Sequence, residues 1–236
     1  MVQGDQVRLK LSCGPDATMF VGSQANGRVF KHEQLADAEQ IVVGTVESSG
    51  CAVVFPEPVV LHAASRFVQR QEWSVAKGAS LVLGDWFQSG RSDSGEQFAY
   101  QAWTSETRLT IDGRLACVDR FRSDPDKDDP DSPARFGGRN LMLNVYVAGP
   151  VCEYLAGTLD ALAAIEEVPQ LLELDQKADA VYPGVVSSLT AVEGQDLSIL
   201  RCLADTREDL NFVFEALYTA LADAAWLGFN PANRKP

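Results

Sequence analysis

The stretch 55–98 constrains the fold most, because it brings charged residues into strongly apolar surroundings. Its apolar run 80–84 predicts a buried strand that ends at Asp85. Gly90-Arg91 and Gly95-Glu96 follow, and their glycines permit tight backbone turns. A carboxylate buried away from water must be paired with a cation or bound to a metal. The spacing therefore predicts either a salt-bridged turn that holds the fold together or a carboxylate with a function.

Alternating apolar and polar residues predict that most of the chain is β-structure. Asn26-Gly27 and Asp112-Gly113 predict hairpins, because these dipeptides favour the turns that join antiparallel strands. Pro56 and Pro58 predict a rigid corner, since proline cannot donate to a strand ladder. The expected strands span residues 7–11, 17–30 with a central turn, 41–55 with a turn at 49–50, 66–75, 80–87, 97–112, 114–121, 141–147, 182–192 and 197–204.

Two helices are expected in the C-terminal third of the chain. Gly149-Pro150 opens the first, over residues 151–167, and Asp205 or Thr206 caps the second, which runs to residue 227. A length of 236 residues suits a single domain, 1–236. The Asp- and Pro-rich segment 123–138 predicts a solvated, mobile loop. It does not match a calcium-binding EF-hand loop, because prolines interrupt it and no terminal glutamate follows.

The chain is acidic, with 33 Asp and Glu against 20 Lys and Arg and a formal net charge of −13. This charge argues against nucleic acid and anionic membrane surfaces as partners. No apolar run is long enough to span a bilayer, and the N-terminus shows no signal-peptide pattern. Five dispersed cysteines predict reduced thiols in a cytoplasmic protein, and two histidines argue against a Cys/His metal cage. No catalytic set of residues is recognisable, which favours a protein that is not an enzyme.

The spacing D-x-x-x-x-G-R-x-x-x-G-E from Asp85 to Glu96, preceded by P-x-P, resembles the UreD (UreH) family of urease accessory proteins. The resemblance extends over nearly the whole chain, including the acidic residue before arginine at Asp119. Departures are Gly27 in place of a hydroxyl residue and Arg28 in place of lysine. The segment that precedes the Gly-Asp turn in the family is expected to be absent here. The other positions that carry the resemblance are Gln24, Pro56, Pro58, Gly90, Arg91, Gly95, Glu96 and Arg120.

The resemblance implies a mainly β fold, in which strands stack helically and two α-helices lie in the C-terminal third. It further implies a scaffold that binds UreF, and through it the GTPase UreG, on the urease apoprotein. Nickel would pass through an internal tunnel toward the urease active site, with no tightly bound cofactor. The family's acidic tunnel positions correspond to Asp85, Asp119 and Asp5, which become candidate transient Ni²⁺ ligands. Arg91 and Glu96 have a mainly structural role in this interpretation.

Three alternatives remain open at this point. In the first, Asp85 and Asp119 form buried salt bridges, with Arg91 and Arg120 as the expected partners. In the second, the chain is a stand-alone β-rich protein that binds a ligand or a metal. A hydrolase would use Asp85 and Glu96 as acid and base, which requires the two carboxyls to face one cleft about 5–10 Å apart.

Overall fold

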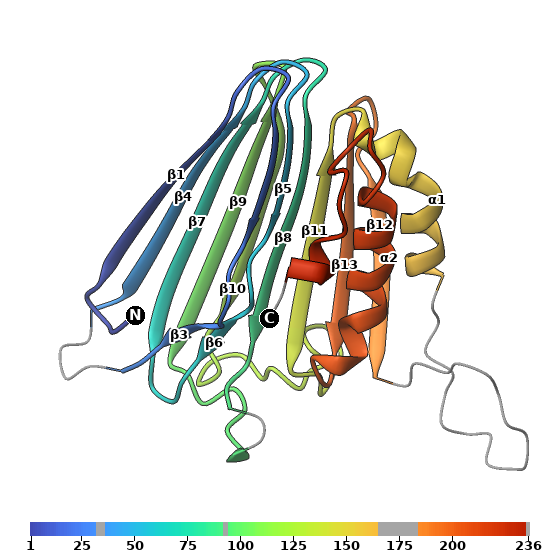
Figure 1. Ribbon diagram of the computed structural model, residues 1–236. Coiled ribbons are helices and arrows are strands. Elements are labelled where there is room, and N and C mark those ends of the chain that lie inside the picture. The colour runs from blue at the N-terminus through green and yellow to red at the C-terminus, as the bar shows by residue number, and fades with distance from the viewer. Residues whose placement is uncertain (32–35, 92–93, 165–183, 235–236) are drawn as a thin grey trace, which may run out of the picture.

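The computed structural model describes residues 1–31, 36–91, 94–164 and 184–234. Strands stack in two layers, and helices cover the outer side of one of them (Figure 1). The chain passes repeatedly from one layer to the other, so that strands far apart in the sequence lie side by side. The predicted fold class, mainly β with stacked strands and two α-helices in the C-terminal third, is confirmed.

The first layer is a five-stranded sheet in the order β1-β4-β7-β9-β10. Its first four strands pair in parallel, whereas β10 joins β9 through a hairpin at Asp112-Gly113, as predicted. The strand bounds are Gln6–Cys13 for β1, Ala38–Val46 for β4, Arg66–Val75 for β7, Ala102–Ile111 for β9 and Arg114–Ser123 for β10.

The second layer is an eight-stranded sheet whose main path runs β12-β13-β11-β8-β5-β2. The short strands β3 and β6 pair with each other, and β6 also pairs with the far end of β8. The bounds are Thr18–Gly22 for β2, Gly27–Val29 for β3, Cys51–Phe55 for β5, Val59–Leu61 for β6, Ser80–Gln88 for β8, Leu141–Ala148 for β11, Val185–Ala191 for β12 and Leu197–Ala204 for β13.

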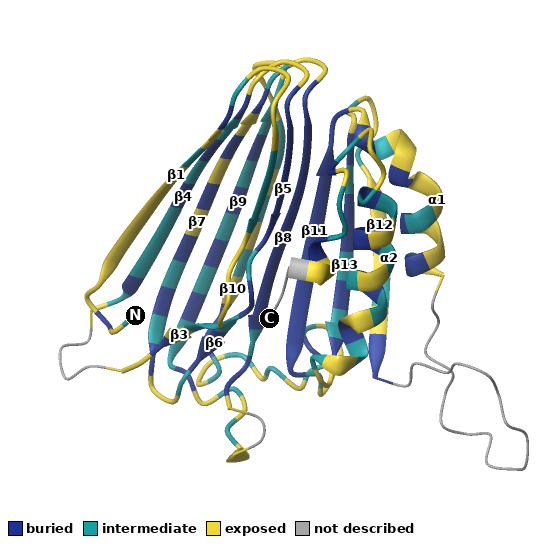
Figure 2. Ribbon diagram, viewed as in Figure 1, coloured by how far each residue is buried: buried dark blue, intermediate teal, exposed yellow. Residues whose placement is uncertain are grey.

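Helices cover the eight-stranded sheet over β11 to β13 (Figure 1). Figure 2 shows the effect on burial: β8 and β11 are buried almost throughout, whereas β7 and β9 alternate between buried and more exposed positions. Strands covered on both faces have continuous apolar sequences, whereas in strands covered on one face apolar and polar residues alternate. The helical elements are α1 (Val151–Ala163), the 3₁₀ turn η2 (Glu208–Leu210), α2 (Asn211–Leu221) and the 3₁₀ turn η3 (Pro231–Arg234).

The hairpin predicted at Asn26-Gly27 is wrong. β2 and β3 do not pair with each other but with β5 and β6, both in parallel. The segment between β2 and β3 is therefore a bend within one turn of the strand stack, which we call a coil, and the strands on both sides of it pair with the next coil.

Several element ends differ from the sequence prediction. β9 begins at Ala102 rather than at residue 97, and α2 ends at Leu221 rather than at residue 227. Thr206 caps the 3₁₀ turn ahead of α2, because its hydroxyl and the Asp209 carboxylate accept each other's backbone N–H. The predicted end of the first helix at residue 167 and the start of the strand at residue 182 lie outside the described residues.

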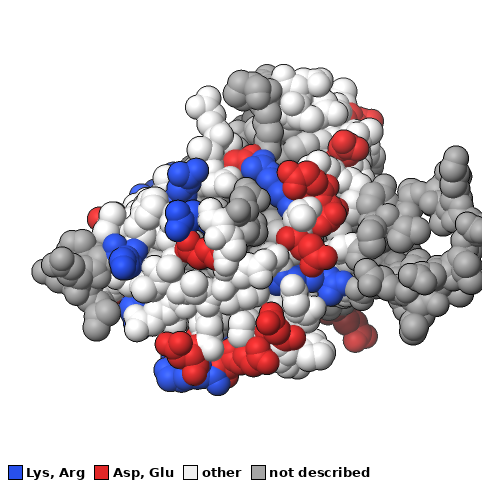
Figure 3. All heavy atoms as spheres, turned by 90° about the horizontal axis from the view of Figure 1, so that it is seen from below, with Lys and Arg blue, Asp and Glu red and all other residues white. Residues whose placement is uncertain are grey.

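The acidic segment 123–138 is attached to the core through Phe136, which is 1% exposed and packs against Phe98 at a centroid distance of 4.9 Å. Within the segment, Lys127 pairs with the nearly buried carboxylate of Asp124 at 2.6 Å. The mobility of this loop stays a prediction. Acidic and basic side chains are interspersed around an uncharged middle at this lower end of the stack (Figure 3).

Candidate functional site

A band of polar side chains crosses the interior between the two sheets. On the five-stranded sheet, Gln69 lies beside Ser105, and Gln71, Thr107 and Asp119 lie in one row across three strands. On the facing sheet, neighbouring strands place three more polar residues in a row. We call these residues, with the Tyr146 hydroxyl, the polar layer: Gln69, Gln71, Asp85, Ser105, Thr107, Asp119, Asn144 and Arg201.

Apolar side chains enclose the polar layer along both directions of the strands. One cluster contains Trp73 and Leu109, and the other contains Phe67, Phe87 and Trp103. The amide, hydroxyl and Asp85 side chains of the layer are all less than a tenth exposed. Buried polar groups are costly unless they are hydrogen-bonded, so a whole layer of them across a core requires an explanation beyond folding.

Asp85 lies at the centre of this layer and is 7% exposed. Gln69 Nε2 donates to its Oδ1 at 2.7 Å, and the Ser105 hydroxyl donates to its Oδ2 at 3.5 Å. Burial raises the pKa of Asp85 to about 6, aided by the charge of Asp119, while the hydrogen bonds from Gln69 and Ser105 lower it. Among the described residues no cation pairs with Asp85, so at neutral pH it is a buried, ionised and uncompensated carboxylate.

The corner at Pro56 and Pro58 opens the eight-stranded sheet beside Asp85. β8 pairs with β5 as far as Leu83 and with β6 from Phe87 onward, which leaves the backbone edge between them unpaired with either strand. Proline cannot close such a gap because it has no N–H to donate. The Trp86 indole N–H donates to the Pro56 carbonyl at 2.6 Å and fixes the corner in this open position.

A cavity of about 350 Å³ fills this opening and reaches the polar layer. Its outer part is formed by bends of successive coils, where the Ser23 hydroxyl accepts the backbone N–H of Glu57 at 2.7 Å. Its inner wall includes Gln69, Gln71 and Asp85. Glu57 also lines it and forms an ion pair with Arg207. The central carboxylate is thus reached from one side through a gap in the sheet.

Asp119 lies at the opposite end of the layer, on the edge strand β10. The Tyr146 hydroxyl and Arg201 Nη2 donate to the same oxygen of Asp119, at 2.7 and 2.6 Å. Arg201 Nη1 donates to the Asn144 amide oxygen at 3.1 Å. The Asp119 side chain is 17% exposed and that of Arg201 40%, so this end of the layer borders solvent.

The salt-bridge partners predicted for the two aspartates are wrong. Arg91 pairs with Glu96 at 2.6 Å, and Arg120 pairs with Glu106 at 2.6 Å. Asp85 lies within β8, three residues before its end, and its side chain points into the layer rather than toward the following turn. Its observed partners are uncharged.

The Arg91–Glu96 pair closes the loop after β8, which agrees with the structural role expected for it. A Cβ at Gly90 would collide with the carbonyl oxygen of Glu96, and Gly95 has a φ of 70°, so both turns require glycine. Glu96 also accepts the backbone N–H of Ala63. The hydrolase alternative finds no support, because within the described residues the cavity that includes Asp85 does not include Glu96.

The remaining sequence candidates lie outside the polar layer. Asp5 is exposed, and its carboxylate accepts the backbone N–H of Val2 at 2.8 Å in a local turn. Gln24 is exposed in the bend between β2 and β3, and Arg28 is exposed on β3. The structure thus brings Asp85 and Asp119 into one layer but leaves Asp5 apart from them.

Replacing Glu96 by glutamine is expected to lower the free energy of unfolding by about 1 kcal/mol at pH 7. Burial raises the pKa of Glu96, but the hydrogen bonds from Arg91 and Ala63 and the Arg91 charge bring it below its ordinary value of 4.5. The stabilisation is therefore present above pH 4.5 and is lost as the pH falls through the folded-state pKa. Urea unfolding at pH 7 and at pH 3.5 measures this: the difference in free energy of unfolding between the variant and the natural chain should be smaller at pH 3.5 than at pH 7.

Sequence reasoning missed most of the polar layer. The missing residues are Gln69, Gln71, Ser105, Thr107, Asn144, Tyr146 and Arg201. A signal was present: several strands carry one or two polar residues at inward positions, flanked two residues away by large apolar ones. β7 has Phe67, two glutamines and Trp73, and β9 has Trp103, two hydroxyl residues and Leu109.

Most of the side-chain atoms in the layer that could bind a metal ion are oxygens. In the described part of the chain no group of three His, Cys, Asp or Glu side chains is arranged to hold a metal ion. Cys117 lies near Asp119, and burial followed by the Asp119 charge raises the pKa of its thiol, which stays protonated at neutral pH. Carboxylate, amide and hydroxyl oxygens bind divalent cations more weakly than thiolates and imidazoles bind nickel. The described part of the layer therefore offers only weak ligands to a divalent cation.

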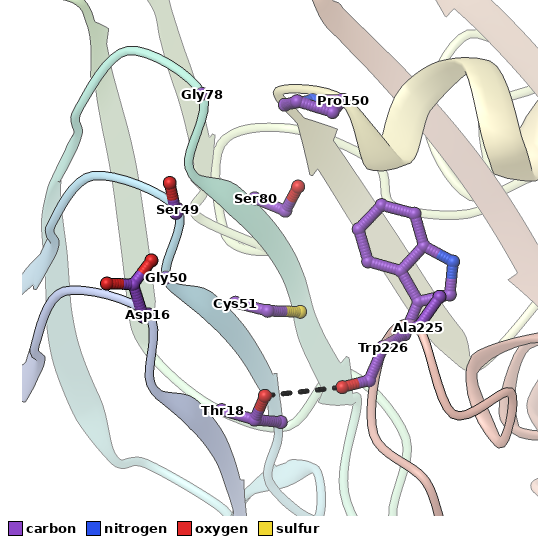
Figure 4. A pocket seen from close by; sticks show the side chains of 10 residues that line it. All are labelled: Asp16, Thr18, Ser49, Gly50, Cys51, Gly78, Ser80, Pro150, Ala225 and Trp226. Carbon is purple, nitrogen blue, oxygen red and sulfur yellow. Dashed lines mark hydrogen bonds between the residues drawn. The ribbon is translucent and has the colours of Figure 1, made fainter.

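A second cavity, of about 370 Å³, lies near the turns between β1 and β2 and between β4 and β5 (Figure 4). The Thr18 hydroxyl donates to the Trp226 carbonyl at 3.3 Å, which attaches the C-terminal segment to the strands. Burial raises the pKa of the Cys51 thiol to about 11, so this side chain is a neutral part of the wall. The cavity has no connection with the polar layer through its lining residues.

Comparison with known proteins decides the family. The family described as "UreD urease accessory protein" matches residues 1–235. The chain belongs to the UreD family. A urease accessory protein UreD of Cytophaga hutchinsonii is 30% identical over 98% of this chain and 80% of its own length. A second, of Sorangium cellulosum, is 31% identical over 72% of this chain and 52% of its own length. The chain thus spans about half the length of some curated relatives and most of others.

The family extends to plants. Urease accessory protein D of Arabidopsis thaliana is 30% identical over 48% of this chain and 38% of its own length.

The described residues of the present chain contain no helix with the length and apolar character needed to cross a membrane.

Proposed function

We propose that this chain serves in urease maturation, as a cytoplasmic scaffold that binds UreF, and through it the GTPase UreG, on the urease apoprotein. In this role it passes Ni²⁺ toward the urease active site through the polar layer. Membership of a family of urease accessory proteins supports the first part. The observation that carries the second part is the buried, uncompensated carboxylate of Asp85, reached through a gap in the sheet.

The chemistry of the layer favours transit. A passage for cations must lower the cost of removing the ion from water without holding it tightly. Asp85 supplies one negative charge in the interior, and the side chains of Gln69, Ser105 and Asn144 supply neutral polar groups around it. The second carboxylate, Asp119, lies near enough for its charge to raise the pKa of Asp85. Two weak stations in sequence would let an ion move between them.

The direct test is assembly. The natural chain, co-expressed with UreF and UreG from the same source, should co-elute with both and with added urease apoprotein. Asp119→Asn should leave this co-elution unchanged, because the Asp119 carboxylate points between the sheets and its side chain is only 17% exposed. It should lower the nickel content of the assembled urease by about tenfold. Nickel per urease active site, measured by atomic absorption, provides the second readout.

The control is Asp126→Asn, which removes the same charge from an exposed position in the loop after β10. It should match the natural chain in co-elution and nickel loading. If the natural chain folds but captures neither UreF nor urease, the scaffold role is excluded. If it assembles and Asp119→Asn loads nickel normally, the passage through the polar layer is excluded while the scaffold role stands.

A further inference from the structure

We propose that Arg201 is a gate at the Asp119 end of the polar layer: its guanidinium occupies the carboxylate where a travelling divalent cation would bind. This inference rests on the proposed passage of nickel and adds a regulating residue to it. Arg201 would keep the layer from retaining cations and would move aside when one arrives from Asp85.

The contacts of Arg201 join the two sheets at their open edge. Its Nη2 reaches Asp119 on β10 of the five-stranded sheet, and its Nη1 reaches Asn144 on β11 of the eight-stranded sheet. The backbone of Arg201 lies on β13, directly opposite Asn144 in the strand register. One side chain thus spans the end of the layer between the sheets.

The environment of Arg201 suits a side chain that moves. It is 40% exposed, so its guanidinium can swing into solvent without losing hydration. The Tyr146 hydroxyl donates to Asp119 at 2.7 Å, and this hydrogen bond would remain after Arg201 leaves. The carboxylate therefore stays oriented toward the layer while one of its partners is exchanged for a cation.

The opposite end of the layer has a similar arrangement. Glu57, on the wall of the cavity that leads to Asp85, forms an ion pair with Arg207, whose guanidinium also lies 5.5 Å from the centre of the Trp86 ring. Each outer carboxylate thus has an arginine, whereas Asp85 between them has none among the described residues. In this order, paired then unpaired then paired, a cation that binds either outer carboxylate competes with an arginine for it.

The test is binding of Ni²⁺ to the purified full chain at pH 7.5, by equilibrium dialysis. Arg201→Gln preserves a hydrogen bond to Asn144 but removes the charge, so it should bind Ni²⁺ at least about tenfold more tightly than the natural chain. Arg201→Lys keeps a cation beside Asp119 and should bind like the natural chain. The double variant Asp119→Asn with Arg201→Gln should lose the gain in affinity.

Each outcome decides the question. Equal affinity of Arg201→Gln and the natural chain overturns the gate, as does equally tight binding by Arg201→Lys or by the double variant. A merely structural role of Arg201 would shift the thermal unfolding midpoint of both single variants without changing Ni²⁺ affinity. Because dialysis uses neither UreF nor urease, failure of the proposed assembly would appear in the co-elution experiment and not here.

Discussion

At pH 7.5 the free energy of unfolding of Asp85→Asn is expected to exceed that of the natural chain by about 2–3 kcal/mol. Burial raises the pKa of Asp85 from 3.8 to about 6, so the folded protein favours the protonated carboxyl. Protonation therefore stabilises the fold fully below pH 3.8, and this contribution is lost as the pH rises through 6. Asparagine stays neutral at every pH and preserves hydrogen bonding to Gln69 and Ser105. Urea unfolding at pH 4 and pH 7.5 should show the gain only at the higher pH.

The same substitution should reduce nickel incorporation into urease by about tenfold or more, because it removes the carboxylate of the layer that pairs with no cation among the described residues. Asp85→Glu, which preserves the charge, should retain part of the nickel incorporation despite an added methylene in a packed interior. If Asp85→Asn is more stable than the natural chain and yet loads less nickel into urease, misfolding cannot explain the loss. If Asp85→Asn is destabilised at pH 7.5, the carboxylate has a cationic partner in solution and the passage loses its central station.

Gly44→Ala is expected to lower the free energy of unfolding by about 3 kcal/mol or more. Gly44 on β4 lies opposite Trp73 on β7, and a Cβ at this position would overlap the indole ring. Trp73 is 1% exposed and covers one side of the polar layer, so it has no free space into which to move. Guanidinium unfolding monitored by tryptophan fluorescence measures the loss.

The matched control is Gly157→Ala. Gly157 lies within α1, and a Cβ there meets no atom within 4 Å. This substitution should stabilise the protein by up to about 1 kcal/mol, because alanine favours a helix more than glycine does. Equal stability of Gly44→Ala and the natural chain would mean that β4 and β7 do not pair in the observed register.

Local signals predicted the elements well. Alternating residues marked β7 and β11 and an apolar run marked β8, all nearly to the residue, and Asp112-Gly113 marked the hairpin between β9 and β10. The same reasoning failed at Asn26-Gly27, where strand pairing with the next coil prevails over a local turn. A dipeptide predicts a bend in the chain but not which strand will lie beside the next segment.

The partners of the buried carboxylates were beyond local reasoning. Arg120 follows Asp119 on β10, and neighbouring residues on a strand point to opposite faces of the sheet. Arg91 lies in the loop beyond the end of β8, where it pairs with Glu96 rather than Asp85. The actual partner of Asp119, Arg201, lies 82 residues away on another sheet. Only the register of several strands together reveals that Gln71, Thr107 and Asp119 share a row. The family resemblance pointed to Asp85 and Asp119, which share the polar layer, and to Asp5, which lies apart from it, without indicating what surrounds them.

Because the coils stack in parallel, the length of the route through the stack changes in steps of one strand. The layer and the cavity that leads to it run across the strands, so each strand that they cross adds about 4.8 Å to the route. β1 and β2 form one open side of the stack, beside the coil that β4 and β5 complete. A further coil added there would lengthen the route by one strand while leaving Asp85, Asp119 and their contacts unchanged. Natural variation in the number of coils would therefore adjust the distance over which an ion is carried, independently of the groups that carry it.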